Sequence, residues 1–288
     1  MKLAAFTINS QKHIGVVKGE KVISLTLLDG NQYPSCLKTF IEKSKELLPL
    51  AENLIERDSE DAVFPISDVK LLPPIPSPEK IICVGLNYID HCRETGMEPP
   101  SSPVIFSKYA NAIVGHNDAV EIPINSKEVD FEAELAIVIG KEAKRVTEEK
   151  ANDYVFGYTI MNDISARDLQ FKDGQWSRGK TADTFAPTGP VIVTKDEAGD
   201  PHSLSISLEL NGENMQDSNT SNLIFTIPQI ISFLSQSMTL RPGDLIATGT
   251  PPGVGMGRDP KVWLKDGDKM SITIQNIGTL SNYVIGDL

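Results

Sequence analysis

Along most of this chain, hydrophobic residues alternate with polar ones or form short unbroken runs, and both patterns are typical of β-strands. After residue 79 such runs follow one another at short intervals, with few helical patterns between them. The predicted strands include residues 80–85, 103–108, 112–115, 119–123, 134–140, 155–163, 189–194, 204–212, 244–249 and 270–276. The pattern therefore predicts a mainly β fold with some α/β elements.

One segment, residues 226–237, has the period of a helix instead. Its apolar residues recur at the spacing of one helix face: Ile227, Ile230, Ile231 and Leu234. Thr226 is a good N-cap residue, and Pro228 suits the first turn. We expect this helix to pack its apolar face on the sheet.

The first part of the chain differs from the rest. Short β-rich runs at residues 2–9, 13–19 and 21–25 precede helical patterns at 36–48 and 50–58. Five prolines then fall between residues 64 and 80, where they remove backbone donors and favour an extended chain. We place a boundary near residues 70–78, which predicts a small α/β domain over 1–72 and a strand-rich domain over 73–288.

Composition narrows the class of protein. The 288 residues carry a formal charge of −12, which disfavours binding to nucleic acid. No apolar run approaches the ~18 residues of a membrane span, and the first residues have neither signal-peptide nor transit-peptide character. Cys36, Cys83 and Cys92 are too widely spaced for a CxxC pair. We expect a cytoplasmic protein with reduced thiols and no membrane or nucleic-acid partner.

The stretch DFEAELAIVIG, residues 130–140, begins a buried-strand pattern with three acidic residues. Because strand side chains alternate between faces, Glu132 and Glu134 point the same way and lie ~6.5–7 Å apart. Two carboxylates in such a place, if buried, must be protonated, paired with a cation or bound to a metal. The alternative is a solvated strand end.

A third carboxylate, Asp163, follows the predicted strand 157–161 and can reach across to a neighbouring strand. Three hard oxygen ligands without a nearby His or Cys would select Mg²⁺, Mn²⁺ or Ca²⁺. The alternative for Asp163 is ordinary turn chemistry, since both Asn162 and Asp163 are good turn formers.

A possible acid–base pair lies upstream, in the sequence NYIDHCRETG. If Asn87 caps a short helix that Gly96 closes, His91 and Glu94 stand at i and i+3 on one face. A carboxylate beside an imidazole is the minimal arrangement for a His general base. The alternative is a surface His–Glu pair. The following proline-containing segment, residues 96–103, is a candidate lid.

Two further segments are rich in turn-forming residues. RGKTADTFAPTGP contains Lys180, and RPGDLIATGTPPGVGMG ends a strand in a Gly/Pro loop with Thr248 and Thr250. Backbone N–H groups of such a loop could hold a substrate carboxylate, although its glycines do not match nucleotide-binding fingerprints. The alternative is a tight structural loop.

Five motifs occur together in one order: GLNYIDHCRE, EVDFEAELAIVIGK, GYTIMNDISARDLQ, GKTADTFAPTGP and TGTPPGVG. In this combination the chain resembles the fumarylacetoacetate hydrolase superfamily, in its acylpyruvate hydrolase-like branch, over roughly residues 70–288. The resemblance implies a mixed β-sandwich roll that is usually a homodimer. It also implies that Mg²⁺ or Mn²⁺ binds to Glu132, Glu134 and Asp163.

The same resemblance implies roles for six other residues. The catalytic ones are His91, Glu94 and Lys180, and those facing the substrate are Arg167, Gln170 and Thr250. The enzyme that cleaves fumarylacetoacetate itself has a further acidic ligand and a longer chain.

These expectations indicate an enzyme acting on small 2-oxo or diketo acids. Such an acid chelates the metal through its carboxylate and ketone oxygens, and the cation stabilises the enolate formed when a bond at C3 breaks. Our leading expectation is hydrolysis of a C–C bond in an acylpyruvate-type substrate. The alternatives are oxaloacetate decarboxylation, and tautomerisation or 2-hydroxymuconate-type isomerisation. A non-catalytic binding protein with the same fold is a further alternative.

Overall fold

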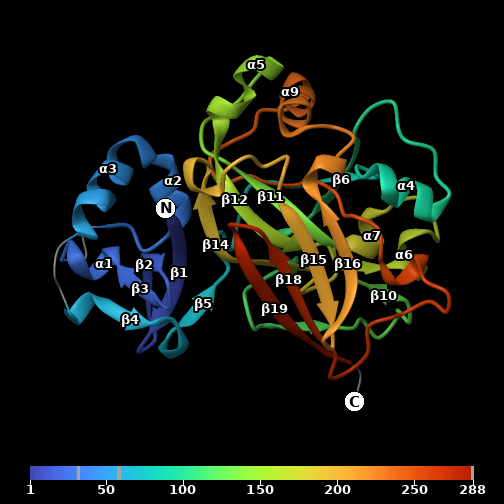
Figure 1. Ribbon diagram of the computed structural model, residues 1–288, viewed down its shortest axis with the longest axis horizontal. Coiled ribbons are helices and arrows are strands. Elements are labelled where there is room, and N and C mark those ends of the chain that lie inside the picture. The colour runs from blue at the N-terminus through green and yellow to red at the C-terminus, as the bar shows by residue number, and fades with distance from the viewer. Residues whose placement is uncertain (31–32, 57–59, 287–288) are drawn as a thin grey trace.

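One large mixed sheet runs through the molecule (Figure 1). The computed structural model describes residues 1–30, 33–56 and 60–286. The order of neighbouring strands in this sheet is β4 (Val63–Pro65), β3 (Lys21–Ser24), β2 (Gln11–Lys18), β1 (Lys2–Ile8), β14 (Ala186–Thr194), β12 (Val155–Asn162), β11 (Ala133–Ile139), β17 (Leu245–Ala247), β6 (Ile81–Gly85) and β7 (Val104–Lys108). Two short strands join beside this path: β5 (Lys70–Leu72) on β1 and β8 (Ile113–Val114) on β14. The predicted mainly β fold is confirmed.

A second, five-stranded sheet packs against the face of the first (Figure 1). Its order is β16 (Glu213–Asn219), β15 (Ser205–Leu210), β18 (Lys269–Ile274), β19 (Gly278–Ile285) and β9 (Ala119–Glu121). In β15, buried and accessible positions alternate, so that Ile206, Leu208 and Leu210 face the large sheet. The central strands β11 and β12 are buried on both faces. This two-layer arrangement is the predicted sandwich.

The N-terminal unit forms a lobe beside the rest of the molecule (Figure 1), but it shares the large sheet. Its strand β1 pairs with β14 at Lys2–Val193 and Leu3–Ile192. The proline-containing segment that marks the predicted boundary holds β4 and β5, which pair with β3 and β1. Helices α1 (Leu25–Leu28), α2 (Leu37–Glu42) and α3 (Ser44–Leu54) complete the unit. Of the predicted helix 50–58, residues 57–58 lie outside the described part of the chain.

The remaining helices lie at the ends of the strands. They are α4 (Ile89–Thr95), α5 (Glu148–Ala151), α6 (Arg167–Gln170), α7 (Ser177–Lys180), α8 (Lys195–Ala198) and α9 (Ile227–Ser237). The predicted helix 226–237 is confirmed as α9, with Thr226 as its N-cap and its four apolar positions buried. It packs beside α5 at one end of the sheet (Figure 1). No helix in the described ranges is long and apolar enough to cross a membrane.

Candidate active site

The three predicted metal carboxylates come together where β11 and β12 meet. The antiparallel register pairs Ala133 with Asn162, so the start of β11 lies beside the end of β12. Glu132 precedes β11, Glu134 is its second residue, and Asp163 directly follows β12. One oxygen from each lies within 4.8 Å of the others. The geometry therefore offers three hard oxygen ligands to one cation.

These carboxylates are buried, so the solvated strand end is wrong as an interpretation of the acidic run. Glu132 is 6% exposed, Glu134 2% and Asp163 0%. Burial, with the charges of Asp163 and Glu132, raises the pKa of Glu134 well above its usual range. A divalent cation bound among the three would favour the charged form of each, and the donor set fits Mg²⁺ or Mn²⁺.

Two buried lysines face the same carboxylates. Lys180, the last residue of α7, places its Nζ 2.8 Å from Glu132 Oε2 and 2.9 Å from Asp163 Oδ2. Lys108, at the end of β7, places its Nζ 2.7 Å from Asp163 Oδ1, and both side chains are fully buried. Burial lowers the pKa of Lys108, although the charge of Asp163 opposes this. Sequence reasoning missed Lys108, which looks like a polar residue ending an apolar strand.

Arg167 also faces Glu132, although it was expected to face the substrate. Its Nη2 lies 2.7 Å from Glu132 Oε1 and 2.8 Å from Asp130 Oδ2, and its Nη1 donates to Gln170 Oε1 at 3.0 Å. Burial alone would lower the pKa of Arg167, but Glu132 and Asp130 hold it above its usual value. The guanidinium of Arg167 is therefore engaged mainly with side chains of the protein itself. Thr250 likewise accepts a hydrogen bond, from Gln216 Nε2 at 2.8 Å.

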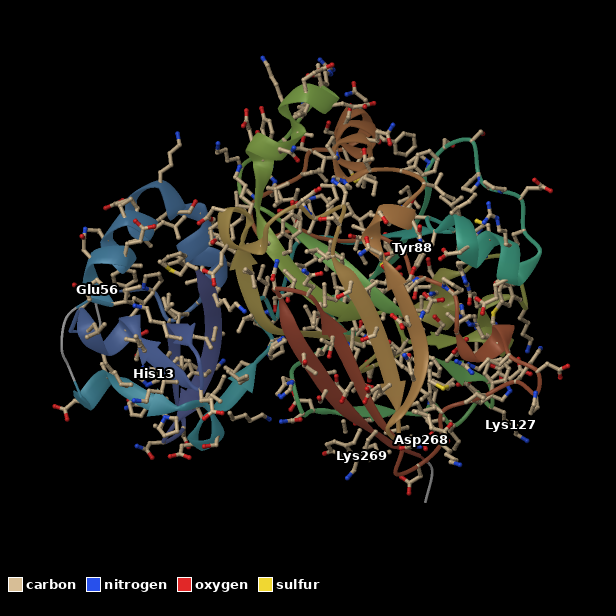
Figure 2. All side chains as sticks on the ribbon, in the orientation of Figure 1. His13, Glu56, Tyr88, Lys127, Asp268 and Lys269 are labelled. Atoms are coloured by element: carbon tan, nitrogen blue, oxygen red, sulfur yellow. The ribbon has the colours of Figure 1, made fainter. Side chains whose placement is uncertain are left out.

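The predicted His91–Glu94 contact is present on helix α4, with His91 Nδ1 lying 3.0 Å from Glu94 Oε2. The side chains are 8% and 17% exposed, which makes the surface-pair alternative wrong. The N-cap of α4 is Tyr88 and not the predicted Asn87. Tyr88 is fully buried and is labelled in Figure 2. The Asn87 side-chain amide instead bonds to backbone groups of Phe225 and to the carbonyl oxygen of Thr248, the residue directly after β17. The predicted closure at Gly96 is confirmed.

The Gly/Pro loop after β17 directs its N–H groups at the protein's own carboxylates. Gly249 N–H donates to Glu134 Oε2 at 2.8 Å, and Gly253 N–H donates to Glu94 Oε1 at 2.8 Å. Further along the loop, the N–H groups of Gly255 and Met256 donate to Asp130. These four N–H groups therefore serve internal carboxylates, and binding of a substrate carboxylate by the rest of this loop stays a prediction.

A pocket opens beside Glu132 and Glu134, two of the predicted metal ligands, and His91. Every predicted site residue lines it except Glu94 and Asp163. Its apolar wall is formed by Leu86, Met97, Phe106, Phe171, Trp176 and Met256. Met97 belongs to the mostly exposed segment that we considered as a lid. The pocket thus has both charged and apolar side chains in its lining.

Comparison with known protein families identifies one model, the fumarylacetoacetate hydrolase C-terminal family, which matches residues 80–285. Among curated relatives, a mitochondrial oxaloacetate tautomerase of Xenopus laevis is 46% identical over 269 residues, covering 93% of this chain and 83% of the relative. Because this relative is mitochondrial, the cytoplasmic location stays a prediction.

Solved structures share the whole fold. A 2-hydroxyhepta-2,4-diene-1,7-dioate isomerase from Mycobacterium marinum is 37% identical with a TM-score of 0.79, covering 100% of this chain and 99% of its own. A maleylpyruvate hydrolase from Sphingobium sp. SYK-6, in complex with manganese(II) and pyruvate, is 34% identical with a TM-score of 0.83, and both chains are covered in full.

Proposed function

The chain belongs to the fumarylacetoacetate hydrolase family, and we propose that it is a divalent-metal-dependent enzyme that interconverts the keto and enol forms of a small 2-oxo acid, oxaloacetate first. The observation that carries the proposal is the buried cluster of three carboxylates beside a His–Glu pair, with one pocket between them. The oxaloacetate tautomerase and the isomerase among the relatives favour this reaction over the C–C hydrolysis that we expected first.

The charges around the pocket support an anionic substrate only together with a cation. Among the described residues, the buried charged cluster beside the pocket contains four carboxylates and three cationic side chains. The carboxylates are Asp130, Glu132, Glu134 and Asp163, and the cations are Lys108, Arg167 and Lys180. With all four ionised the sum is one negative charge, and with Glu134 neutral, the form that its burial favours, the sum is zero, so neither state attracts a carboxylate. A divalent cation on Glu132, Glu134 and Asp163 would make the sum positive, and the chemistry it would supply when bound is stabilisation of negative charge on the C2 oxygen of the substrate.

The proton transfer falls to the chain's own residues. Tautomerisation breaks the C3–H bond, and its electron pair forms the C2=C3 bond. The proton passes from C3 to a base, and the protonated base returns it to the C2 oxygen. With Nδ1 of His91 donating to Glu94, Nε2 is the nitrogen that takes or returns the C3 proton. Lys180 holds Glu132 and Asp163 in place and adds positive charge near the developing enolate.

A second candidate is hydrolysis of an acylpyruvate-type C–C bond. It is favoured by the maleylpyruvate hydrolase among the structural relatives and by the same His–Glu pair, which could activate water instead of moving the C3 proton. We further propose, from the family resemblance, that two copies of the chain form a dimer.

The deciding experiment follows three reactions of two substrates, each with Mg²⁺ and with Mn²⁺. The enol absorbance of oxaloacetate, pyruvate release from maleylpyruvate, and CO₂ release from oxaloacetate are recorded in parallel. Tautomerase activity relaxes the enol absorbance faster than buffer with metal alone, with no CO₂ released. Pyruvate release without accelerated enol relaxation would replace the proposal with hydrolysis, and rapid CO₂ release would replace it with decarboxylation.

A further inference from the structure

Asp130, which ends the short strand β10 (Val129–Asp130), is a carboxylate that sequence reasoning did not single out. It is fully buried, and its two oxygens accept hydrogen bonds from four nitrogens and lie beside a fifth as an ion pair. Backbone N–H groups donate at 2.8 Å from Phe131, 2.6 Å from Gly255 and 3.0 Å from Met256. Arg167 adds its Nε at 2.9 Å and its Nη2 at 2.8 Å. One carboxylate thus joins its own strand, helix α6 and the Gly/Pro loop.

Two of these connections continue into the candidate active site. Through Arg167, Asp130 reaches Glu132, whose Oε1 lies 2.7 Å from Nη2. Through the loop it reaches Glu94, because Gly253 N–H donates to Glu94 Oε1 at 2.8 Å, two residues before the loop meets Asp130. Asp130 is therefore the shared anchor of a metal carboxylate and of the His–Glu pair.

The loop between these contacts has little freedom to move by itself. At Gly253 the backbone has a φ of +104°, and an added Cβ would lie 1.9 Å from the carbonyl oxygen of Met215. At Gly255 an added Cβ would lie 1.9 Å from the carbonyl oxygen of Val262 and 2.7 Å from Asp130 Oδ1. Because the loop is packed this closely, its position is set by its contacts.

We propose that Asp130 is a positioning residue that fixes Glu132 and Glu94 relative to each other across the pocket. Asp130 is absent from the described residues that line the pocket, so it acts through Arg167 and the loop. The proposal rests on the proposed function in that it takes this pocket as the site of metal binding and proton transfer. Groups that orient metal ligands typically contribute roughly 10–100-fold to metal affinity or activity.

The main test is Asp130→Asn. The substitution keeps the shape of the side chain but replaces one acceptor oxygen with an NH₂ group, which would face N–H donors of Arg167 or the loop. It also leaves the buried guanidinium with less negative charge. We expect the dissociation constant for Mn²⁺, measured by titration calorimetry, to rise roughly 10–100-fold, and kcat at saturating Mn²⁺ to fall by a similar factor.

Asp244→Asn is the matched control, because Asp244 is equally buried but lies away from the pocket. Its oxygens accept N–H groups of Lys80 at 3.0 Å and Arg241 at 2.7 Å, and Lys80 Nζ lies 3.1 Å away. Glu134 lies near the start of β11, whereas Asp244 lies at the other end of this strand. There the backbone carbonyl of Asp244 accepts a hydrogen bond from the N–H of Ile139, the last residue of β11. We expect this variant to lower the unfolding temperature and to leave Mn²⁺ affinity and kcat unchanged.

A second variant keeps the test decisive if Asp130→Asn does not fold. The double substitution Asp130→Asn with Arg167→Gln removes one buried charge of each sign, so the net charge of the cluster is kept and Glu132 still pairs with Lys180, yet it removes the link from Asp130 to Glu132. The proposal is overturned if whichever variant folds shows wild-type Mn²⁺ affinity and kcat, or if Asp244→Asn lowers Mn²⁺ affinity and kcat as much. Failure of the proposed function would appear differently, as wild-type protein that binds Mn²⁺ but relaxes no enol.

Discussion

Replacing Lys108 with Met tests how strongly the buried ion pair with Asp163 supports the site. Met approximates the length of the side chain but removes its charge. The pair is fully buried and 2.7 Å apart, and at an effective dielectric constant of about 20 the attraction is about 6 kcal/mol. The ammonium also donates to the carbonyl oxygens of Ile164, at 3.0 Å, and Lys180, and both would lose this partner.

Part of that attraction is offset, because Met removes the cost of burying the ammonium. Removing one partner of a buried ion pair typically costs roughly 3–5 kcal/mol, so we expect that loss in the unfolding free energy of Lys108→Met. For a chain of this size it corresponds to a fall of roughly 6–10 °C in unfolding temperature. The measurement is thermal and denaturant unfolding in the presence of a chelator.

Lys70→Met is the control, because Lys70 Nζ pairs with Asp118 at 2.9 Å but its side chain is 63% exposed. Such a pair contributes about 0–1 kcal/mol. If Lys108→Met were as mild as Lys70→Met, the reasoning would be refuted, since the buried pair would then contribute no more than an exposed one.

Three further predictions concern the metal, the base and the assembly. Glu134→Gln should weaken Mn²⁺ binding in calorimetry by more than the ~10–100-fold typical of an outer partner, because it removes a ligand charge; unchanged affinity would exclude Glu134 as a ligand. His91→Ala should lower kcat by roughly 10²–10⁴ at unchanged Mn²⁺ affinity, and a normal kcat would show that His91 moves no proton. Light scattering should give twice the 31.4 kDa of one chain, and a monomer mass at micromolar concentration would contradict the proposed dimer.

The strands that pattern reasoning predicts are those whose hydrophobic residues face a core. The strands β11 and β12 are examples, because both are buried on both faces and read as apolar runs. By contrast, β16 and β19 are absent from the strands named above. The first is an edge strand of mostly polar residues. In β19 the inward position Asn282 interrupts the apolar alternation, and its amide is satisfied by the carbonyl oxygens of Gly115 and Asp118.

The site was predictable where its geometry is local. The spacing of Glu132 and Glu134 follows from the strand period, and that of His91 and Glu94 from the helix period. Lys108 was not predictable in this way, because its partner Asp163 lies 55 positions along the chain and meets it through the packing of separate strands.

The Gly/Pro loop shows why several carboxylates can lie together in a buried site. Burying a carboxylate costs free energy unless hydrogen-bond donors or cations satisfy its oxygens. Without other donors, each buried carboxylate would need its own cationic partners. The loop supplies backbone N–H groups to Glu134, Glu94 and Asp130 instead. Backbone can approach this closely only where side chains are absent, as at Gly253 and Gly255. The glycines of this loop therefore help to build the site, and a side chain at either would displace the backbone donors that hold these carboxylates in place.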